Sequence, residues 1–270
     1  MKRIATALVA VPLTVAIVLG LPQTGLLLVA ILIVGVAVFE YVQLVRRAGA
    51  DRAVVLLLGI VPIAAVALCA DLWGYVWSGP QPVLLAILIC SGLMAVAVLA
   101  SRGDARSSLV AIGALSFGLA YFPAGIVGFA RLHGLHPWVL MVFLVMVWSG
   151  DTAAYLVGTR WGRKKLAPVV SPNKTWLGAA ASLVATVLVA GLWTFWWFGA
   201  IEPAFIGAAA AASLAAQLGD LVESLLKRGV GVKDSASLLP GHGGMLDRLD
   251  GLLMAAPCFY LLLWALGAAV

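Results

Sequence analysis

Long apolar runs recur from one end of this sequence to the other, and they constrain its fold more than any other feature. A helix rises about 1.5 Å per residue, so a run of about 18 residues can cross a hydrocarbon core of roughly 30 Å. Polar breaks divide the chain into nine such runs, at residues 4–20, 25–42, 53–70, 82–100, 109–130, 137–158, 176–198, 204–226 and 251–269. Because the runs do not alternate in polarity, they favour membrane-spanning helices over the strands of a barrel.

The composition excludes an ordinary soluble protein. Of the 270 residues, 64% are hydrophobic and 10% are charged, whereas a soluble domain carries roughly 25% charged residues. We therefore expect one all-α, polytopic integral membrane domain over residues 1–270. Residues 1–130 would form lipid-facing helices, with contacts in a homodimer as an option, and residues 137–270 would carry the catalytic helices and loops. The basic start resembles a secretory signal, but no cleavage site follows, so we expect a retained first helix.

The basic residues predict the orientation of the protein. Alternate connections between the runs put all but one of the 17 lysines and arginines on one side, and only Arg131 on the other. By the positive-inside rule, the amino terminus is expected in the cytoplasm and the carboxyl terminus outside. The long basic loops at 159–175 and 227–250 then lie on the cytoplasmic side of the cytoplasmic membrane. Membrane lipids are expected partners, and nucleic acid is not.

Acidic residues within the runs are the strongest functional signal, because a carboxylate that faces lipid is costly. Asp151 lies in the cytoplasmic half of run 137–158, and Asp220 and Glu223 lie near the inner end of run 204–226. Offsets of three, four and seven give one polar helical face, made of Gln217, Asp220, Ser224 and Lys227. An internal ion pair of Asp220 or Glu223 with Lys227 is the alternative that needs no ligand.

Asp247 and Asp250 add two carboxylates at the start of the last run. They lie three residues apart and share a helical face, and ordinary helix capping is the alternative explanation for them. With Asp220 and Glu223 they surround one polar loop, and anions at that density repel unless a cation lies between them. Oxygen ligands without cysteine or paired histidine favour Mg²⁺ or Mn²⁺ over zinc.

The loop at 227–250 supplies phosphate-binding chemistry beside these acids. Its cations are Lys227, Arg228, Lys233 and Arg248. Its glycines, Gly241, Gly243 and Gly244, let backbone N–H groups close on an anion, with His242 among them. Metal ligands, cations and a glycine turn together indicate phosphoryl or nucleotidyl transfer.

The loop at 159–175 has a similar character. Ser171, Lys174 and Thr175 follow a proline-marked turn just before a helix, where free N–H groups and the helix dipole favour an anion. The alternative is a basic loop that only sets topology, with Ser171 or Thr175 as a helix cap.

Residues 224–250, SLLKRGVGVKDSASLLPGHGGMLDRLD, resemble the signature of the phosphatidate cytidylyltransferases, also called CDP-diacylglycerol synthases. The resemblance extends to GDL at residues 219–221, WSGDTAAY at 148–155 and SPNKT at 171–175. It covers roughly the carboxyl-terminal half, and the first five runs match only in being hydrophobic. Asn173 and Leu177 depart from the pattern, which commonly has a lysine and a glutamate there.

The resemblance implies transfer of the cytidylyl group of CTP to phosphatidate, giving CDP-diacylglycerol and pyrophosphate, with Mg²⁺ required. Mn²⁺ is a second option, and a monovalent cation such as K⁺ an additional one. Metal binding falls to Asp220 and Asp247, with Asp250 and Asp151 in support. The expected catalytic residues are Asp220, Asp247, Asp250, Lys227 and His242. The expected substrate-binding residues are Ser171, Lys174, Thr175, Ser224, Arg228, Lys233, Asp234, Gly243, Gly244 and Arg248.

Three other functions are alternatives to the cytidylyl transfer to phosphatidate. A cytidylyltransferase for another lipid phosphate, such as an isoprenoid phosphate, would share these features. A cation-coupled transporter would need acids near the midplane and a pathway to both faces, whereas the polar residues here gather on one side. A CDP-alcohol phosphotransferase would need Asp-Gly-x-x-Ala-Arg, but Asp250-Gly251 continues as Leu-Leu-Met-Ala.

Overall fold

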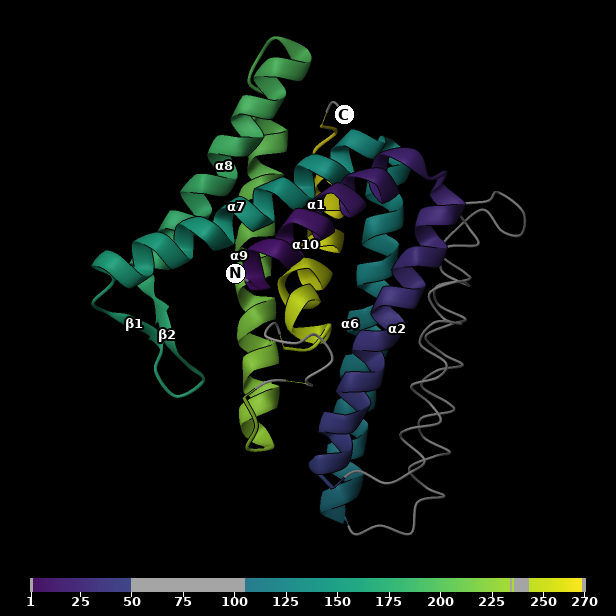
Figure 1. Ribbon diagram of the computed structural model, residues 1–270, viewed down its shortest axis with the longest axis vertical. Helices are drawn as coiled ribbons and strands as arrows, with labels where there is room; N and C mark the ends of the chain where they lie inside the picture. Colours follow the sequence, from purple (N-terminus) through teal and green to yellow (C-terminus); the bar gives the residue numbers. More distant parts are fainter. Residues whose placement is uncertain (1, 50–104, 234, 236–242, 269–270) are drawn as a thin grey trace.

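The computed structural model describes residues 2–49, 105–233, 235 and 243–268, and Figure 1 shows them as a bundle of helices with a short hairpin at its side. In chain order the elements are α1 (Lys2–Gly20), α2 (Gln23–Arg47), α6 (Ala105–Leu135), α7 (Pro137–Trp161), β1 (Lys165–Ala167), β2 (Ser171–Thr175), α8 (Trp176–Phe198), α9 (Pro203–Gly229) and α10 (Leu246–Ala265). The predicted runs at 53–70 and 82–100 lie outside the described residues.

Six of the described helices are long and apolar enough to span a membrane: α2, α7, α8, α9, α10 and the part of α6 from Val110 to Leu135. Their outward surfaces are apolar, as contact with lipid requires. Leu32 of α2 and Leu192 of α8, for example, are 71% and 70% exposed. The prediction of an all-α polytopic membrane protein is confirmed at this level, while the total of nine spans and the sides of the two termini stay predictions.

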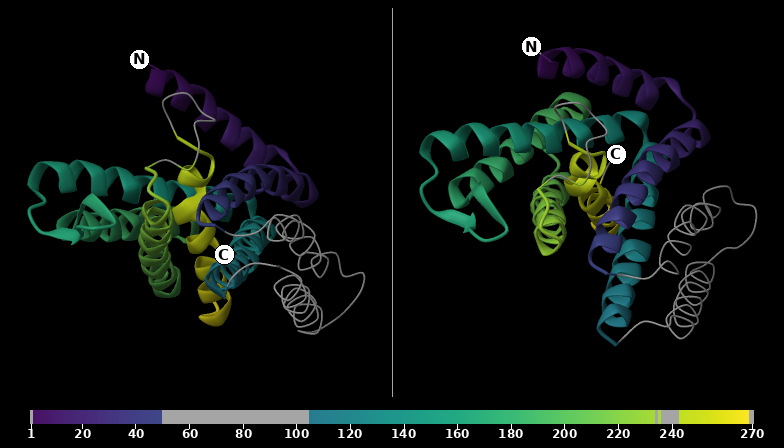
Figure 2. Two further views of the ribbon diagram at one scale, coloured as in Figure 1. Left: turned by 90° about the horizontal axis from the view of Figure 1, so that it is seen from below. Right: turned by 60° about the horizontal axis from the view of Figure 1, so that its bottom comes forward.

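Helix α10 lies inside the bundle, between α9 and α6, while α2 packs on α6 and α8 pairs with α7 (Figure 2). Small residues let α9 and α10 approach closely, as is common for helices in membranes. A Cβ atom at Gly219 would collide with the carbonyl oxygen of Asp250, and one at Gly251 would lie 3.1 Å from that of Ala216. The crossing therefore brings Asp220 and Asp250, the neighbours of these glycines in sequence, to the same level of the bundle.

Two buried apolar cores hold the helices together. One joins α2, α6 and the start of α10 and includes Tyr41 and Phe122, and the other joins α7, α9 and α10 and includes Phe143 and Phe259. The hydroxyl of Tyr41 also donates to the carbonyl oxygen of Ala114 at 2.8 Å. Helix α2 is thus fastened to α6 by both packing and a hydrogen bond.

One end of the bundle collects the polar connections. In Figure 1, α2 and α9 end and α6 begins toward the bottom, α10 begins in the lower half, and the hairpin that connects α7 to α8 projects downward at the side. The connections from α6 to α7 and from α8 to α9 lie at the other end, toward which Arg131 of α6 lies. The basic end of α2, the basic end of α9 and the hairpin lie toward the lower end, whereas the grouping of all the basic connections on one membrane side stays a prediction.

Residues 159–175, predicted as one loop, contain regular structure. Helix α7 continues to Trp161, and β1 and β2 pair antiparallel with Lys165 opposite Thr175 and Ala167 opposite Ser171. No alternation of apolar and polar residues marks these short strands, so the sequence pattern could not predict them. Backbone pairing and the bond from the Trp176 N–H to the Lys164 carbonyl oxygen, 3.1 Å long, hold them. The hairpin is a small exception to the all-α prediction.

The last helix begins at Leu246, before the start of the predicted run at residue 251. Asp247, Arg248 and Asp250 interrupt the apolar run, so hydropathy places the boundary too late. They do not interrupt the helix, because polar partners are present at this end of the bundle. Asp247 and Asp250 therefore lie in the first two turns of α10.

Candidate active site

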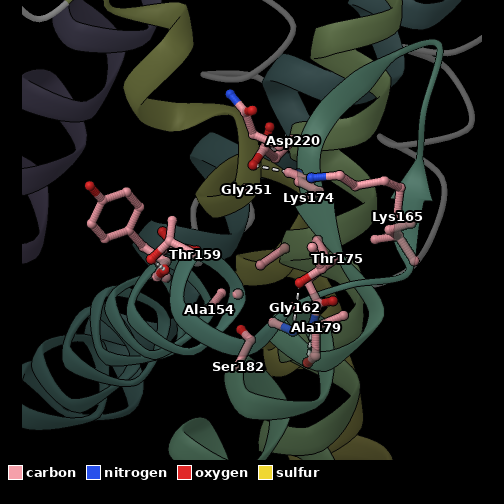
Figure 3. Close-up of a pocket in the computed structure, with 18 of the residues that line it drawn as sticks. Ala154, Thr159, Gly162, Lys165, Lys174, Thr175, Ala179, Ser182, Asp220 and Gly251 are labelled. Carbon is pink, nitrogen blue, oxygen red and sulfur yellow. Dashed lines mark hydrogen bonds and ion pairs between the residues drawn. The ribbon is translucent and has the colours of Figure 1, made fainter.

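A cavity of about 670 Å³ lies between α7, α8, α9, α10 and the hairpin (Figure 3). Three acids line it, Asp151 from α7, Asp220 from α9 and Asp250 from α10, and two lysines, Lys165 and Lys174, line it from the hairpin. The rest of the wall is mostly small or polar and includes Gly158, Thr159, Gly178, Ala179, Ser182 and Gln217. The cavity therefore presents carboxylates and cations to one volume, which suits an anionic ligand bound together with a cation.

Asp220 connects α9 to the hairpin. One of its carboxylate oxygens pairs with the Nζ of Lys174 at 2.5 Å (Figure 3), and the side chain of Asp220 is 41% exposed. The other oxygen accepts from the hydroxyl of Ser224 at 3.4 Å. Asp220 and Ser224 thus share one face of α9 as predicted, and Asp220 stays accessible to a ligand in the cavity.

Asp250 is held at both its side chain and its backbone. Its Oδ1 accepts from the N–H of Gly251 at 2.7 Å, and its carbonyl oxygen accepts from the hydroxyl of Tyr121. Asp220 and Asp151 line the same cavity as Asp250. Carboxylates that share a cavity repel one another when both are charged, unless a cation lies between them. These three acids therefore form the part of the site most suited to bind a cation.

Lys227 lies between two acids just beyond the cavity. Its Nζ is 2.5 Å from an oxygen of Glu223 and 2.5 Å from Oδ1 of Asp247. The alternative of an internal ion pair is therefore confirmed for Glu223. Oδ2 of Asp247 accepts from the N–H of Gly244 at 2.7 Å and from the N–H of Ser235 at 3.2 Å, so both oxygens of Asp247 bind protein donors.

Glu40 of α2 joins this second cluster, although it was not among the predicted site residues. Its carboxylate accepts from the N–H groups of Met245 and Leu246, each at 2.8 Å, and from the hydroxyl of Ser235 at 2.9 Å. The signal was present in the sequence, because Glu40 is an acid inside an apolar run, like Asp151. Its great separation in sequence from the polar loops hid the connection.

Lys165 is a second residue that the sequence did not single out. It is one of four consecutive or nearly consecutive cations, at residues 160–165, and nothing in their order distinguishes it. The pairing of Lys165 with Thr175 in the hairpin is what brings it to the cavity wall.

The other predicted binding residues lie around these two clusters. Arg228 donates to the carbonyl oxygens of Val170 at 3.4 Å and Val232 at 3.1 Å, and so ties the hairpin turn to the end of α9. The hydroxyl of Thr175 accepts from the N–H of Gly178 at 3.1 Å. The alternative that Thr175 caps α8 is therefore confirmed, and Thr175 also lines the cavity.

The remaining predicted residues differ in accessibility. Lys233 and Arg248 are exposed, and Ser171 is partly exposed at the start of β2. Gly243 has a φ angle of 76°, a backbone conformation that glycine adopts without strain. Asp234 and His242 lie outside the described residues, so their roles stay predictions.

Mg²⁺ binds to oxygen ligands, and the acids of the site could supply them. Across the residues that the structure describes, no group of three or more acidic, cysteine or histidine side chains is already gathered as a metal site. Mg²⁺ does not need such a cage, because it is commonly held by one or two carboxylates, water and substrate phosphates. Asp220 and Asp250 at the cavity fit this description. Asp247, whose oxygens already accept from Lys227 and backbone N–H groups, fits it less well.

The sequence of this chain is similar to those of known proteins. The model of the cytidylyltransferase family matches residues 1–266. Phosphatidate cytidylyltransferase of Staphylococcus haemolyticus (strain JCSC1435) is 40% identical over 167 residues, which cover 59% of this chain and 59% of that protein. The protein of the same name from Staphylococcus aureus (strain COL) is 41% identical over 161 residues, with 59% of each chain covered. That of Brucella suis biovar 1 (strain 1330) is 45% identical over 154 residues, covering 53% of this chain and 54% of the relative.

The chain thus spans somewhat more than half the length of these relatives. The family model, in contrast, matches almost the whole sequence, from the first predicted run to the end of α10. Because of that match, this chain belongs to the cytidylyltransferase family.

Proposed function

We propose that this protein transfers the cytidylyl group of CTP to phosphatidate, giving CDP-diacylglycerol and pyrophosphate for phospholipid biosynthesis. The cavity is the observation that carries the proposal. It combines the carboxylates of Asp220 and Asp250 with the amino groups of Lys165 and Lys174, at the basic end of a membrane bundle. The shared name of the similar proteins, phosphatidate cytidylyltransferase, supports the same reaction.

The proposed chemistry needs alignment and charge neutralisation more than proton transfer. The phosphate of phosphatidate is already anionic near neutral pH, so one of its oxygens can attack the α-phosphorus of CTP. A new P–O bond forms there, and the bond from the α-phosphorus to the bridging oxygen breaks to release pyrophosphate. The protein accelerates this step by holding both substrates in line and by neutralising their charge.

The hairpin and the end of α9 would bind the phosphates. Lys165 and Lys174 would bind phosphate oxygens from the cavity wall, while the exposed Lys233 and Arg248 would attract CTP from solution. Lys227 would contact the triphosphate from the inner side, with Asp247 holding its amino group in place. His242, Gly243 and Gly244 complete the proposed anion-binding loop.

Mg²⁺ is part of the proposal, with Mn²⁺ as a substitute and K⁺ as an additional ion. When bound, Mg²⁺ would neutralise charge on the departing pyrophosphate. Asp220 and Asp250 would hold it, with Asp151 in support, and Asp220 would release Lys174 to a phosphate as it does so. Asp247 would reach the ion only when Lys227 turns away from it.

The two substrates come from different phases, and the proposal includes their routes. CTP is water-soluble and phosphatidate has its acyl chains in the bilayer, so a site at the inner ends of the spans is open to both. We propose that this end faces the cytoplasm, that the protein belongs to the cytoplasmic membrane, and that it crosses the bilayer nine times. A homodimer is compatible with this arrangement.

The test uses purified full-length protein in lipid nanodiscs with radiolabelled CTP. We expect a lipid-soluble cytidine product with phosphatidate and Mg²⁺, and none when Mg²⁺ is chelated. An isoprenoid phosphate in place of phosphatidate separates the two acceptor classes, and product from the isoprenoid alone would contradict the proposed substrate. Product from neither acceptor would contradict the proposed reaction.

Asp220→Asn tests the assignment of the site within the same assay. Losing one carboxylate charge at the cavity should lower kcat by roughly 10²-fold or more, while the protein still inserts and folds. Glu202→Gln is the matched control, because it removes the same charge at the opposite end of the bundle, before α9. Full activity of Asp220→Asn would contradict the proposed role of Asp220 in metal binding.

A further inference from the structure

A buried carboxylate from the first part of the chain holds the beginning of α10. Glu40 is 1% exposed, although it lies in an apolar helix. A buried carboxylate is strongly unfavourable without hydrogen-bond donors. Its three donors are the N–H groups of Met245 and Leu246 and the hydroxyl of Ser235, and all of them come from the far end of the sequence.

These hydrogen bonds are made at the start of α10, where the N–H groups have no acceptor within the helix. The first N–H groups of a helix have no partner within the helix, and Met245 at the cap position has no side-chain hydrogen bond to them. Glu40 accepts from two such N–H groups, and its negative charge faces the positive end of the helix dipole. Helix α2 thus supplies the cap that the side chain of Met245 does not.

The same carboxylate connects to Asp247 through one hydroxyl. Oγ of Ser235 lies 2.9 Å from Oε2 of Glu40 and 3.1 Å from Oδ2 of Asp247. Asp247 in turn pairs with Lys227 at 2.5 Å. Three contacts, through Ser235 and Asp247, therefore connect Glu40 to a lysine of the proposed phosphate site.

Gly244 shows how closely these groups are fitted together. A Cβ atom at position 244 would collide with the hydroxyl of Ser235 and with the carboxylate of Glu40. The N–H of Gly244 also donates to Asp247 at 2.7 Å. The absence of a side chain at Gly244 is what lets Glu40 and Asp247 approach the same short segment from opposite sides.

We propose that Glu40 is a positioning residue for the transfer reaction. It holds Gly244–Leu246 and, through Ser235, the carboxylate of Asp247, in the arrangement in which Asp247 orients Lys227. The inference rests on the function proposed above. It gives α2, which the sequence predicted only as a lipid-facing helix, a direct part in ordering the site.

The main variant is Glu40→Gln, studied as the full-length protein in nanodiscs. The amide keeps the size of the side chain but places a donor where an oxygen accepted from Leu246 or Ser235. We expect kcat to fall on the order of 10- to 100-fold, while the KM for CTP changes by less than about threefold, because a misplaced group costs rate more than binding. Hydrogen–deuterium exchange of the amides of residues 244–246 should become faster.

Tyr41→Phe is the matched control on the neighbouring residue. It removes the hydroxyl that binds the carbonyl oxygen of Ala114, and so loosens α2 on α6 while the hydrogen bonds from Met245 and Leu246 to Glu40 stay in place. It should lower the thermal midpoint while kcat and the exchange of residues 244–246 stay as in the wild type. A merely structural role of Glu40 would make the two variants behave alike, and that result would overturn the proposal.

The variant Ser235→Ala and the exchange data provide two further tests of the role of Glu40. If Glu40→Gln does not fold, Ser235→Ala removes the link between Glu40 and Asp247 from the loop side and should also lower kcat and speed exchange at residues 244–246. Wild-type kcat and exchange in Ser235→Ala would then overturn the proposal. If the wild type itself makes no cytidine lipid, the proposed reaction fails, whereas the exchange data alone still decide whether Glu40 holds this segment.

Discussion

Lys165 and Lys174 line the cavity from facing strands of the hairpin, beside Asp220 (Figure 3). Lys174 is paired with Asp220 at 2.5 Å, so a phosphate must compete with that carboxylate, or a metal must replace Lys174 there. Lys165 lies in the same wall of the cavity, and we propose that its ammonium group binds the phosphates of CTP.

Lys165→Gln should raise the KM for CTP roughly tenfold or more, because a hydrogen bond to a charged group contributes about 1.5–3 kcal/mol and 1.4 kcal/mol corresponds to a factor of ten. Steady-state kinetics with varied CTP would measure it. Lys164→Gln removes the same charge one residue earlier and outside the cavity wall, so its KM should stay near that of the wild type. Equal effects of the two variants would mean that only the net charge of the hairpin matters.

Single residues show where sequence reasoning succeeds at this site. Asp220 and Asp250 could be predicted to meet, because both flank one polar loop at one predicted depth. Asp151 is an acid inside an apolar run, which needs a polar interior, and it was predicted in the same half of the membrane. Glu40 obeys the same rule, but its partner segment begins near residue 235 and no spacing connects the two. The pairing of Asp247 with Lys227 could not be predicted either, since several cations in the loop were equally available to it.

Long helices were easier to predict than their ends. The run at 176–198 coincides with α8, because Thr175 caps one end and Gly199 adopts a left-handed conformation, with φ of 72°, at the other. Helix α10 and the hairpin differ from prediction, since charged residues inside a helix and short strands without polarity alternation leave no hydropathy signal. Hydrogen bonds from Glu40 of the distant α2 hold the start of α10, whereas backbone pairing between β1 and β2 holds the hairpin.

The crossing of α9 and α10 makes a prediction about stability. Gly219→Ala would place a methyl group against the carbonyl oxygen of Asp250 and 3.1 Å from Cβ of Met254. Overpacking of this kind should destabilise the protein by about 1–3 kcal/mol, and it should lower activity as well because Asp220 and Asp250 would move apart. Thermal unfolding in detergent, followed by tryptophan fluorescence, would show the change.

Gly113→Ala is the control for the glycine substitution itself. Gly113 lies in α6 with no atom within 4 Å of a Cβ built there. Alanine is the better helix former by roughly 0.5–1 kcal/mol, so this variant should be as stable as the wild type or more so. If both variants were destabilised equally, close packing at the α9–α10 crossing would not be the cause.

The two ends of the bundle differ in chemistry. Tryptophans cluster where α7 begins and α8 ends, with ring centres 6.3 Å apart for Trp138 and Trp193 and 4.9 Å apart for Trp193 and Trp197. Such side chains favour the interface between lipid and water. The opposite end carries the hairpin, the basic end of α9 and the cavity. The protein therefore has an aromatic interface at one end and a basic, ligand-accessible one at the other.

The orientation of these ends can be tested with single cysteines in a background in which Cys69, Cys90 and Cys258 are replaced by alanine. Val169→Cys lies on the hairpin turn, where Val169 is 89% exposed, and Ala200→Cys lies in the exposed connection between α8 and α9. A maleimide that cannot cross membranes should label Ala200→Cys in intact cells, and Val169→Cys only after permeabilisation, because the positive-inside rule places the basic end in the cytoplasm. The reverse labelling would put the cavity outside, where CTP is not supplied, and would contradict both the orientation and the proposed reaction.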